Sequence, residues 1–473
     1  MIFSELPPDV ILSVFACCDV SSVVSTGQTC RHLHSLAVEK SVWVRLLDDL
    51  KRRSILDPTI APNLDVLSIG DLIKVVKSLL TGPSTWTPTE AGFAPQVSKR
   101  ITLHPNILTG PGILTWENET RLLRNGAHVF FNNWGKLECW HVAEDRLVWV
   151  HTAGVENASV LEFAVDEDAG VDVLRIMICV RTYPPGSMDL RENYVEIVDL
   201  DLHKGIHDVC LLVRAPNSRH DNPFSSPVIC GSVAAVTLSA AEGRDSLLLI
   251  DCEAHLTVVL SRILCVIVVA LVPRHIILRT TSKTGEDEIH LILSEDLFTL
   301  HGGPAEFGAH SISVVVNELP LISTQRVAPG SLSSRREPFA WNSYDQMSVH
   351  ACPLHRDTYR LWVYASKRPS HGIASPLDST LSSFDISIVA AELRPRTCVP
   401  ALGPMLYRTI TYSGHTQVFD AYGTRYQQIL PPTLSAASGV VELDDCGDHV
   451  DVGPYSGTLA YSTHKEIVIL YFR

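Results

Sequence analysis

Seven pairs of short β-type runs, each pair joined through a turn signal, recur from about residue 100 to the end of the chain. The pairs are residues 129–131 and 137–142, 174–181 and 194–200, 234–238 and 247–251, 276–280 and 289–293, 361–365 and 384–389, 408–412 and 416–420, and 458–462 and 467–471. Most neighbouring centres lie roughly 40–55 residues apart, which is close to the spacing of propeller blades with four strands each. The pattern predicts an all-β propeller of six or seven blades over residues 100–473.

A second all-β arrangement stays open, because no Gly-His…Trp-Asp signature marks these repeats. A chain of 473 residues is too long for one ordinary hydrophobic core, so two stacked β-domains are the alternative. The chain ends in an apolar run over residues 466–472. We expect that terminal strand to pair with the first-formed blade and close the ring, because closure removes an exposed sheet edge.

Ahead of these repeats, an apolar run begins directly after Leu6-Pro7-Pro8-Asp9. Proline is tolerated in the first turn of a helix, and an aspartate there suits the positive end of the helix dipole. The run predicts a helix that ends near Cys18 and is apolar almost all the way round, whereas a surface helix has one apolar stripe. The helix must bury two faces, and either a partner protein or the rest of the chain covers the second.

The residues that follow complete a small helical module of about 50 residues. A cap and turn at Asp19 lead into a short second helix, and a third helix carries the apolar residues from position 33 onward. This three-helix module resembles an F-box, with Thr29 and Leu33 as the two departures from the usual pattern. The resemblance runs without a gap through Leu6-Pro7, Ile11, Leu12, Val14, Phe15, the turn from Asp19 to Val23, Cys30-Arg31, Leu36 and Trp43.

The resemblance implies binding to the Skp-type adaptor of a cullin-RING, SCF-type ubiquitin ligase. The adaptor-binding residues that it implies are Leu6, Pro7, Pro8, Ile11, Leu12, Val14 and Phe15. The F-box core that it implies is Val23, Cys30, Leu36 and Trp43. The chain is then a non-catalytic substrate-recognition subunit whose β-domain captures a target protein for ubiquitination. The alternative is a β-propeller scaffold or enzyme whose N-terminal helices only cap the large domain.

A connector over residues 51–99 joins the two parts. Three residues that disfavour regular structure, Pro58, Pro62 and Asn63, indicate a linker. Ser68 and Asp71 then form a capping box that opens an amphipathic helix over residues 69–80. We expect this helix to pack against the F-box-like module or the large domain and to fix their relative orientation.

The composition limits the partners and the compartment. A net charge of −14 argues against nucleic acid and membrane surfaces as partners, because phosphate contact needs basic patches. The apolar stretch 258–272 is too short for a membrane span and predicts two buried strands. Twelve scattered cysteines without a CxxC pair or a signal peptide favour the cytoplasm or the nucleus.

Two clusters contain candidate metal ligands, and neither has the spacing of a metal site. Residues 350–355 hold two histidines and a cysteine, but zinc needs about four ligands. Residues 444–451 are acidic but lack the ligand order of a calcium loop. We therefore predict turns at both places, no metal and no cofactor. The sequence assembles no nucleophile, base and oxyanion site, and it does not identify the target-binding residues.

Overall fold

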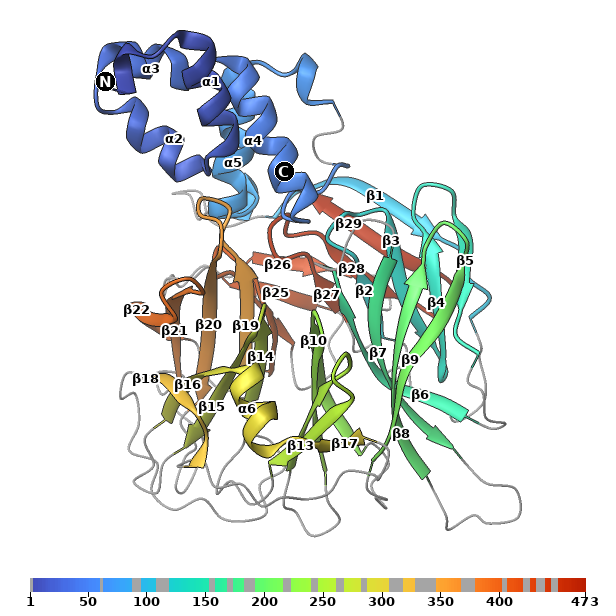
Figure 1. The fold of residues 1–473 in the computed structure, drawn as a ribbon. Coiled ribbons are helices and arrows are strands. Elements are labelled where there is room, and N and C mark those ends of the chain that lie inside the picture. The colour runs from blue at the N-terminus through green and yellow to red at the C-terminus, as the bar shows by residue number, and fades with distance from the viewer. Residues whose placement is uncertain are drawn as a thin grey trace.

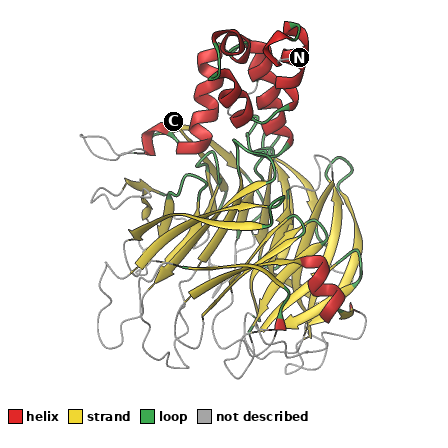
Figure 2. Cartoon of the chain, turned by 60° about the vertical axis from the view of Figure 1, so that its left-hand side comes forward, coloured by secondary structure: helices red, strands yellow, loops and turns green. Residues whose placement is uncertain are grey.

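The computed structural model separates the chain into a helical module and a ring of β-sheets (Figure 1). Figure 2 shows the helices gathered above one rim of the ring, except for α6 (Ser294–His301), which lies beside the strands. The structure describes residues 3–59, 63–86, 95–107, 119–152, 158–167, 173–182, 192–215, 223–239, 246–260, 268–281, 287–305, 318–327, 346–366, 379–401, 406–419, 426–430, 439–443 and 450–473.

The helical module contains four α-helices in residues 8–52 rather than the predicted three. They are α1 (Pro8–Cys17), α2 (Val20–Gly27), α3 (Arg31–Ala37) and α4 (Lys40–Arg52), preceded by the 3-10 helix η1 (Phe3–Glu5). The predicted third helix is divided because Glu39 is extended, with φ −66° and ψ 134°, and begins a new helix. Asp19 caps α2 as predicted, since its side chain accepts a hydrogen bond from the backbone N–H of Ser22.

The connector continues the module. It contains η2 (Leu64–Val66), α5 (Ile69–Thr81) and η3 (Ser84–Trp86). The Ser68 side chain accepts a hydrogen bond from the Asp71 N–H and donates one to the Asp71 carboxylate, which is the predicted capping box. One face of α5 packs against α4 through its buried leucines and Val76. The helix therefore extends the core of the module.

Seven antiparallel sheets form the blades of the ring. The first two sheets are β2 (Thr120–Leu122), β3 (His128–Asn133), β4 (Lys136–His141), β5 (Arg146–Val150), and β6 (Ala158–Asp166), β7 (Val173–Thr182), β8 (Glu192–Asp201), β9 (Ile206–Ala215). The third is β10 (Phe224–Cys230), β11 (Val233–Leu238), β12 (Ser246–Asp251), β13 (Leu256–Leu260) with β17 (Gly303–Pro304). The fourth is β14 (Val268–Val272), β15 (His275–Thr281), β16 (Asp287–Leu293), β18 (Leu321–Arg326).

The last three sheets complete the ring. They are β19 (Gln346–Ala351), β20 (Thr358–Ser366), β21 (Ser379–Ser387), β22 (Glu392–Ala401); β23 (Leu406–Ile410), β24 (Thr416–Phe419), β25 (Tyr426–Leu430), β26 (Gly439–Glu442); and β27 (Val450–Val452), β28 (Leu459–Ser462), β29 (Ile467–Phe472), with β1 (Val97–Leu103). The first strands of successive blades contact one another from β6 through β27, and β27 contacts β2. This closed ring is a seven-bladed propeller and not two stacked β-domains.

The ring closes by pairing strands from the two ends of the β-region. The outermost strand of the last blade is β1, which pairs antiparallel with β29 from Val97–Phe472 to Leu103–Ile467. Figure 1 shows these two strands side by side. The terminal strand therefore closes the ring as expected, but within the last blade, which β1 joins. The pairing covers the outer edge of the C-terminal strand β29, and β1 becomes the edge strand of the blade.

Several local predictions are confirmed. The first predicted turn lies between β3 and β4, where Trp134 and Gly135 both have positive φ, 57° and 79°. A side chain at Gly135 would approach Ser159 to 2.9 Å, so glycine is needed there. The stretch 258–272 begins inside β13 and ends with β14, so it holds parts of two strands as predicted. No described helix is long and apolar enough to cross a membrane. The short helix α6 (Ser294–His301) in the fourth blade was not predicted.

Closure of the ring predicts that buried side chains of β1 stabilise the fold. Leu103 is 0% exposed and lies in the core shared by the first and last blades. We expect Leu103→Ala to lower the free energy of unfolding by about 2–5 kcal/mol, because it leaves a cavity in that core. Urea denaturation followed by circular dichroism measures the change. The matched control is Val97→Ala in the same strand, where Val97 is 46% exposed; an equal effect of both variants would contradict this account.

Candidate docking surface and its mount on the propeller

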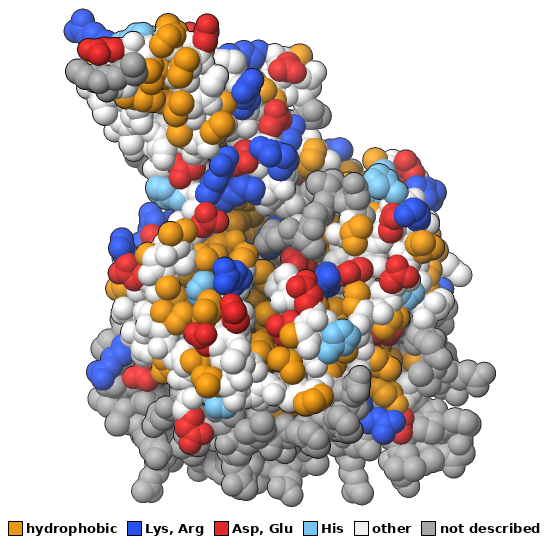
Figure 3. Space-filling view, viewed as in Figure 1, with side chains coloured by type: hydrophobic (Ala, Val, Ile, Leu, Met, Phe, Trp, Pro, Cys, Tyr) orange, Lys and Arg blue, Asp and Glu red, His pale blue; other side chains and the backbone are white. Residues whose placement is uncertain are grey.

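One side of α1 faces solvent with apolar side chains. The helical repeat places Pro7, Val10, Val14 and Cys17 on this side, and all four are exposed. We call these four residues the docking face. Val10 and Val14 are 45% and 39% exposed, so no other part of the described chain covers them. Figure 3 shows hydrophobic side chains gathered on the surface of the helical module.

The opposite side of α1 lies in the core of the module. Ile11 and Phe15 are 0% and 1% exposed, and they pack among residues of the other module helices. The other helices cover both side chains in this conformation, and their role in adaptor binding stays a prediction. Leu6 and Leu12 are half-buried against the same core, and Pro8 is exposed. Val10 and Cys17 were missed because an all-apolar run does not indicate which side the module covers.

Of the four residues predicted to form the F-box core, three are buried and one is exposed. Val23, Leu36 and Trp43 are buried, and the Trp43 indole N–H donates a hydrogen bond to the Ala37 carbonyl at 2.9 Å. Cys30 is exposed, so its prediction as a core residue is wrong. The reason is its extended backbone, with φ −154° and ψ 163°, directly before α3. Its side chain therefore does not follow the helical spacing that the sequence pattern assumed.

A hydrophobic core shared with the propeller holds the module in place. The turn that joins β19 and β20, residues 352–357, projects into the module, and we call it the mounting turn. The core that contains α1, α4 and α5 also contains four propeller residues: Ala351, Cys352, Tyr412 and Tyr455. Tyr455 donates a hydrogen bond to the Ala351 carbonyl at 2.8 Å. Burial of these side chains favours one orientation of the module.

Hydrogen bonds fix the same contact at its edge. The Ser21 N–H at the start of α2 donates to the Leu354 carbonyl at 3.0 Å. The Arg356 guanidinium donates to the Cys17 carbonyl at 3.1 Å and forms an ion pair with Asp49 at 3.2 Å. Two helices and the end of a third are thus held by one turn. The bonds to backbone carbonyls set the position of the helices more firmly than side-chain pairs alone.

The two histidines and the cysteine of residues 350–355 lie in the mounting turn and at the end of β19 before it. The His350 ring donates a hydrogen bond from Nε2 to the Ile410 carbonyl at 2.6 Å, and the Cys352 thiol lies 3.3 Å from the Tyr412 hydroxyl. His355 is exposed and lies 3.6 Å from the Asp19 carboxylate. His350 thus joins the fifth and sixth blades, whereas Cys352 and His355 contact the helical module. Most of the acidic segment 444–451 lies outside the described residues.

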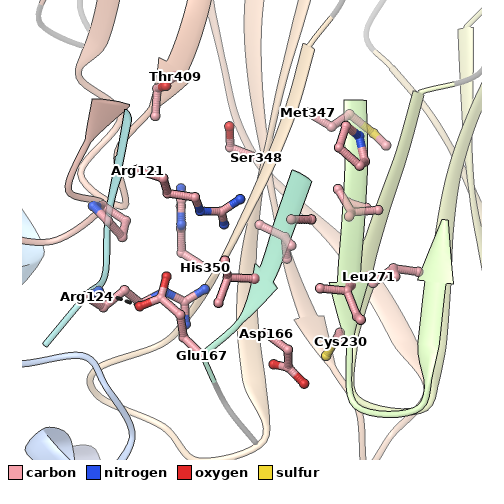
Figure 4. Close-up of a pocket in the computed structure, with 18 of the residues that line it drawn as sticks. Arg121, Arg124, Asp166, Glu167, Cys230, Leu271, Met347, Ser348, His350 and Thr409 are labelled. Atoms are coloured by element: carbon pink, nitrogen blue, oxygen red, sulfur yellow. Dashed lines mark hydrogen bonds and ion pairs between the residues drawn. The ribbon is translucent and has the colours of Figure 1, made fainter. Parts of the chain in front are cut away.

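The chain crosses the mouth of the propeller channel after α4. Arg53 donates to the Cys352 carbonyl in the fifth blade at 2.9 Å, and Ser54 Oγ lies 3.4 Å from the Glu167 carbonyl in the second blade. Below this crossing lies a cavity of about 230 Å³ lined by the first strands of the blades. Figure 4 shows Arg121 extending into it beside the ion pair of Arg124 and Glu167.

The carboxylates around this cavity join neighbouring blades. Asp166 accepts a hydrogen bond from the Gly231 N–H at 2.6 Å, and Asp451 accepts one from the Leu122 N–H at 2.9 Å. Each bond runs from one blade to the next. Burial raises the pKa of Asp451. Among the described residues of this cavity, we find no nucleophile hydrogen-bonded to a base, so the geometry supports a structural role for these carboxylates.

Two buried histidines near the contact between the helical module and the propeller make the stability of the chain depend on pH. Burial lowers the pKa of His350 to about 4 and that of His415 to about 4. His415 donates from Nε2 to the Trp86 carbonyl at 3.1 Å, and its Nδ1 lies 2.8 Å from the Ser413 hydroxyl. Both rings are therefore neutral in the folded chain.

The unfolded chain binds these two protons more readily, since an ordinary histidine has a pKa near 6.5. The stability that the neutral rings provide is complete above about pH 6.5 and is lost as the pH falls toward 4. We expect the free energy of unfolding to fall by about 1–3 kcal/mol per histidine over this range. Urea titrations from pH 7 to 4 measure it, and His415→Gln should flatten the curve, whereas exposed His32→Gln should not.

The helical module matches a known protein family. Residues 3–48 match the F-box-like family. This match covers the whole of α1, α2 and α3 and most of α4. No curated protein matches the chain.

Solved propeller structures resemble the ring only distantly. An oligogalacturonate lyase in complex with manganese is 11% identical, with a TM-score of 0.31 over 75% of this chain and 76% of that chain. The β-propeller domain of the trilobed protease from Pyrococcus furiosus is 10% identical, with a TM-score of 0.32 over 65% and 79%. The WD40 domain of SCAP from fission yeast is 8% identical, with a TM-score of 0.38 over 75% and 84%. The chain therefore consists of an F-box-like domain followed by a β-propeller domain.

Proposed function

We propose that this chain is the substrate-recognition subunit of an SCF-type E3 ubiquitin ligase in the cytoplasm or the nucleus. The F-box-like domain docks to a Skp-type adaptor through Pro7, Val10, Val14 and Cys17, with Leu6 at their edge. The propeller captures a target protein. The observation that carries the proposal is that α1 keeps an exposed apolar face although the module is firmly packed on the propeller.

The exposed face matches what a docking contact needs. Interfaces gain most of their affinity from a few apolar or aromatic side chains that become fully covered. Val10 and Val14 lie one helical turn apart and present such side chains on a rigid backbone. The carboxylate of Asp9 in the first turn lies at the positive end of the helix dipole and is exposed. The face is thus an apolar stripe with a polar border.

The contact between the helical module and the propeller supports the role of a receptor that holds its target at a set distance. A ligase subunit without catalytic groups accelerates ubiquitin transfer by proximity, which requires a rigid connection between its two binding parts. The shared core and the bonds of Arg356 and Ser21 provide that connection. The module lies over the channel mouth beside the mounting turn. We place target capture on propeller surfaces away from this contact.

The alternative, a propeller scaffold or enzyme with the helices as a cap, explains only the buried side of the module. A cap would gain by turning its most apolar helix toward the ring. Here Val10 and Val14 are exposed to solvent, and beside the shared core the contact uses the Cys17 carbonyl and Asp49. The exposed stripe would then cost solubility without a benefit.

The docking face leads to a binding prediction. We expect Val10→Asp with Val14→Asp to weaken co-purification with a purified Skp-type adaptor at least about tenfold, because a buried charge at an interface centre costs more than 1.4 kcal/mol. Isothermal titration calorimetry with the full chain measures the affinity. Circular dichroism must show that the variant is folded.

The matched control is Val66→Asp, because Val66 is 75% exposed but lies on η2 outside the docking face. This variant should bind the adaptor like the unchanged chain. Equal binding by the double variant and the unchanged chain would sink the assignment of the docking face. Absence of binding by the unchanged chain would contradict the proposed function itself.

A further inference from the structure

Three potential metal ligands from two blades meet at the boundary between the first and second blades. His151 follows β5, Glu196 lies in β8 and His207 lies in β9. One ligand atom from each side chain lies within 4.8 Å of the other two. The distance from His151 Nε2 to the Glu196 carboxylate is 3.0 Å, and the two histidine rings lie 5.8 Å apart between centroids. The three residues are separated in sequence, so no spacing motif marks them.

The burial of this cluster is unusual for such polar groups. His151 and Glu196 are 6% and 7% exposed, whereas His207 is half-buried and faces the solvent side. A carboxylate and two imidazoles rarely lose water together unless they are paired or bind a cation. A metal binds the unprotonated nitrogen of an imidazole ring, and each of the two histidines offers one such nitrogen.

Trp149 shows which nitrogen of His207 carries the proton. Its indole N–H donates a hydrogen bond to His207 Nδ1 at 3.0 Å. Indole nitrogen only donates, so Nδ1 has no proton and Nε2 holds it. A metal on Nδ1 would take the accepting lone pair, and a metal on Nε2 would move the proton to Nδ1. In both cases, metal binding by His207 breaks the hydrogen bond from Trp149.

We propose that His151, Glu196 and His207 form a binding site for a divalent transition metal, with Zn²⁺ as the best-suited ion. Two imidazole nitrogens and one carboxylate oxygen are a common zinc ligand set with a fourth, open position. The half-buried side of His207 leaves that position to water. Neighbouring ligand atoms in a tetrahedral zinc site lie roughly 3.3 Å apart, close to the His151–Glu196 distance. The ion joins the first and second blades.

Zinc takes the place of the hydrogen-bonded proton between His151 and Glu196. Without the ion, His151 and Glu196 share a hydrogen bond in which one ring nitrogen donates. On binding, Nε2 of His151 releases its proton to solvent while Nδ1 takes one up, so the ring stays neutral, Nε2 gives its lone pair to the metal, and the carboxylate oxygen binds the same ion. No oxidation or reduction takes place. The competing explanation is a buried His–Glu ion pair that binds nothing.

The experiment uses the full chain, freed of metal with a chelator and dialysed against Zn²⁺. We expect one bound zinc per chain by elemental analysis, and tetrahedral visible absorption bands with Co²⁺ in its place. Glu196→Gln keeps the size of the side chain, and we expect it to weaken zinc binding at least tenfold. His104→Gln is the control, because His104 also pairs with a carboxylate, Asp145, but is exposed. It should leave zinc binding unchanged.

Trp149→Phe supplies a readout that an incidental surface site would not give. Removal of the indole removes the bond that zinc must break, so we expect this variant to bind zinc about two- to tenfold more tightly. Unchanged affinity in this variant would overturn His207 as a ligand and with it the site. No stoichiometric zinc in the unchanged chain, or binding that survives Glu196→Gln, would equally overturn the proposal and leave the His–Glu ion pair.

Discussion

The hydrophobic core that the helical module shares with the propeller determines what each part can do. It brings Ala351, Cys352, Tyr412 and Tyr455 of the ring into contact with α1, α4 and α5. A module of about 45 residues has a marginal core by itself, so these added side chains stabilise it. They also select its orientation. Because the ring supports the module from one side, the outer stripe of α1 remains free.

The same packing explains why a helix that is apolar all round is stable here. Ile11 and Phe15 are covered from within the module, while the end of α1 is held through the Cys17 carbonyl. Only Val10, Val14 and their neighbours on the docking face keep their apolar surface in water. An exposed apolar stripe on a well-anchored helix indicates an interaction site more strongly than single exposed residues do. The F-box-like match of residues 3–48 includes this stripe.

The sequence predicted the architecture better than the site. Paired apolar runs identified middle strands such as β7 and β8, because both faces of these strands are buried. The first strand β2 was missed because its three residues, Thr120–Leu122, are too few and too polar to form an apolar run. Cys30 was misplaced because an extended cap breaks the helical spacing. The choice between Phe15 and Val10 needed the position of the other helices, which no local pattern contains.

Protection of a single thiol tests the central claim most directly. Cys17 lies on the docking face and Cys398 on the propeller, and both are exposed. The full chain is labelled with a maleimide reagent in the absence and presence of saturating Skp-type adaptor, and the labelled peptides are quantified by mass spectrometry. The account predicts that the adaptor slows labelling of Cys17 and leaves Cys398 unchanged. Labelling of Cys17 at the same rate in the complex would contradict it.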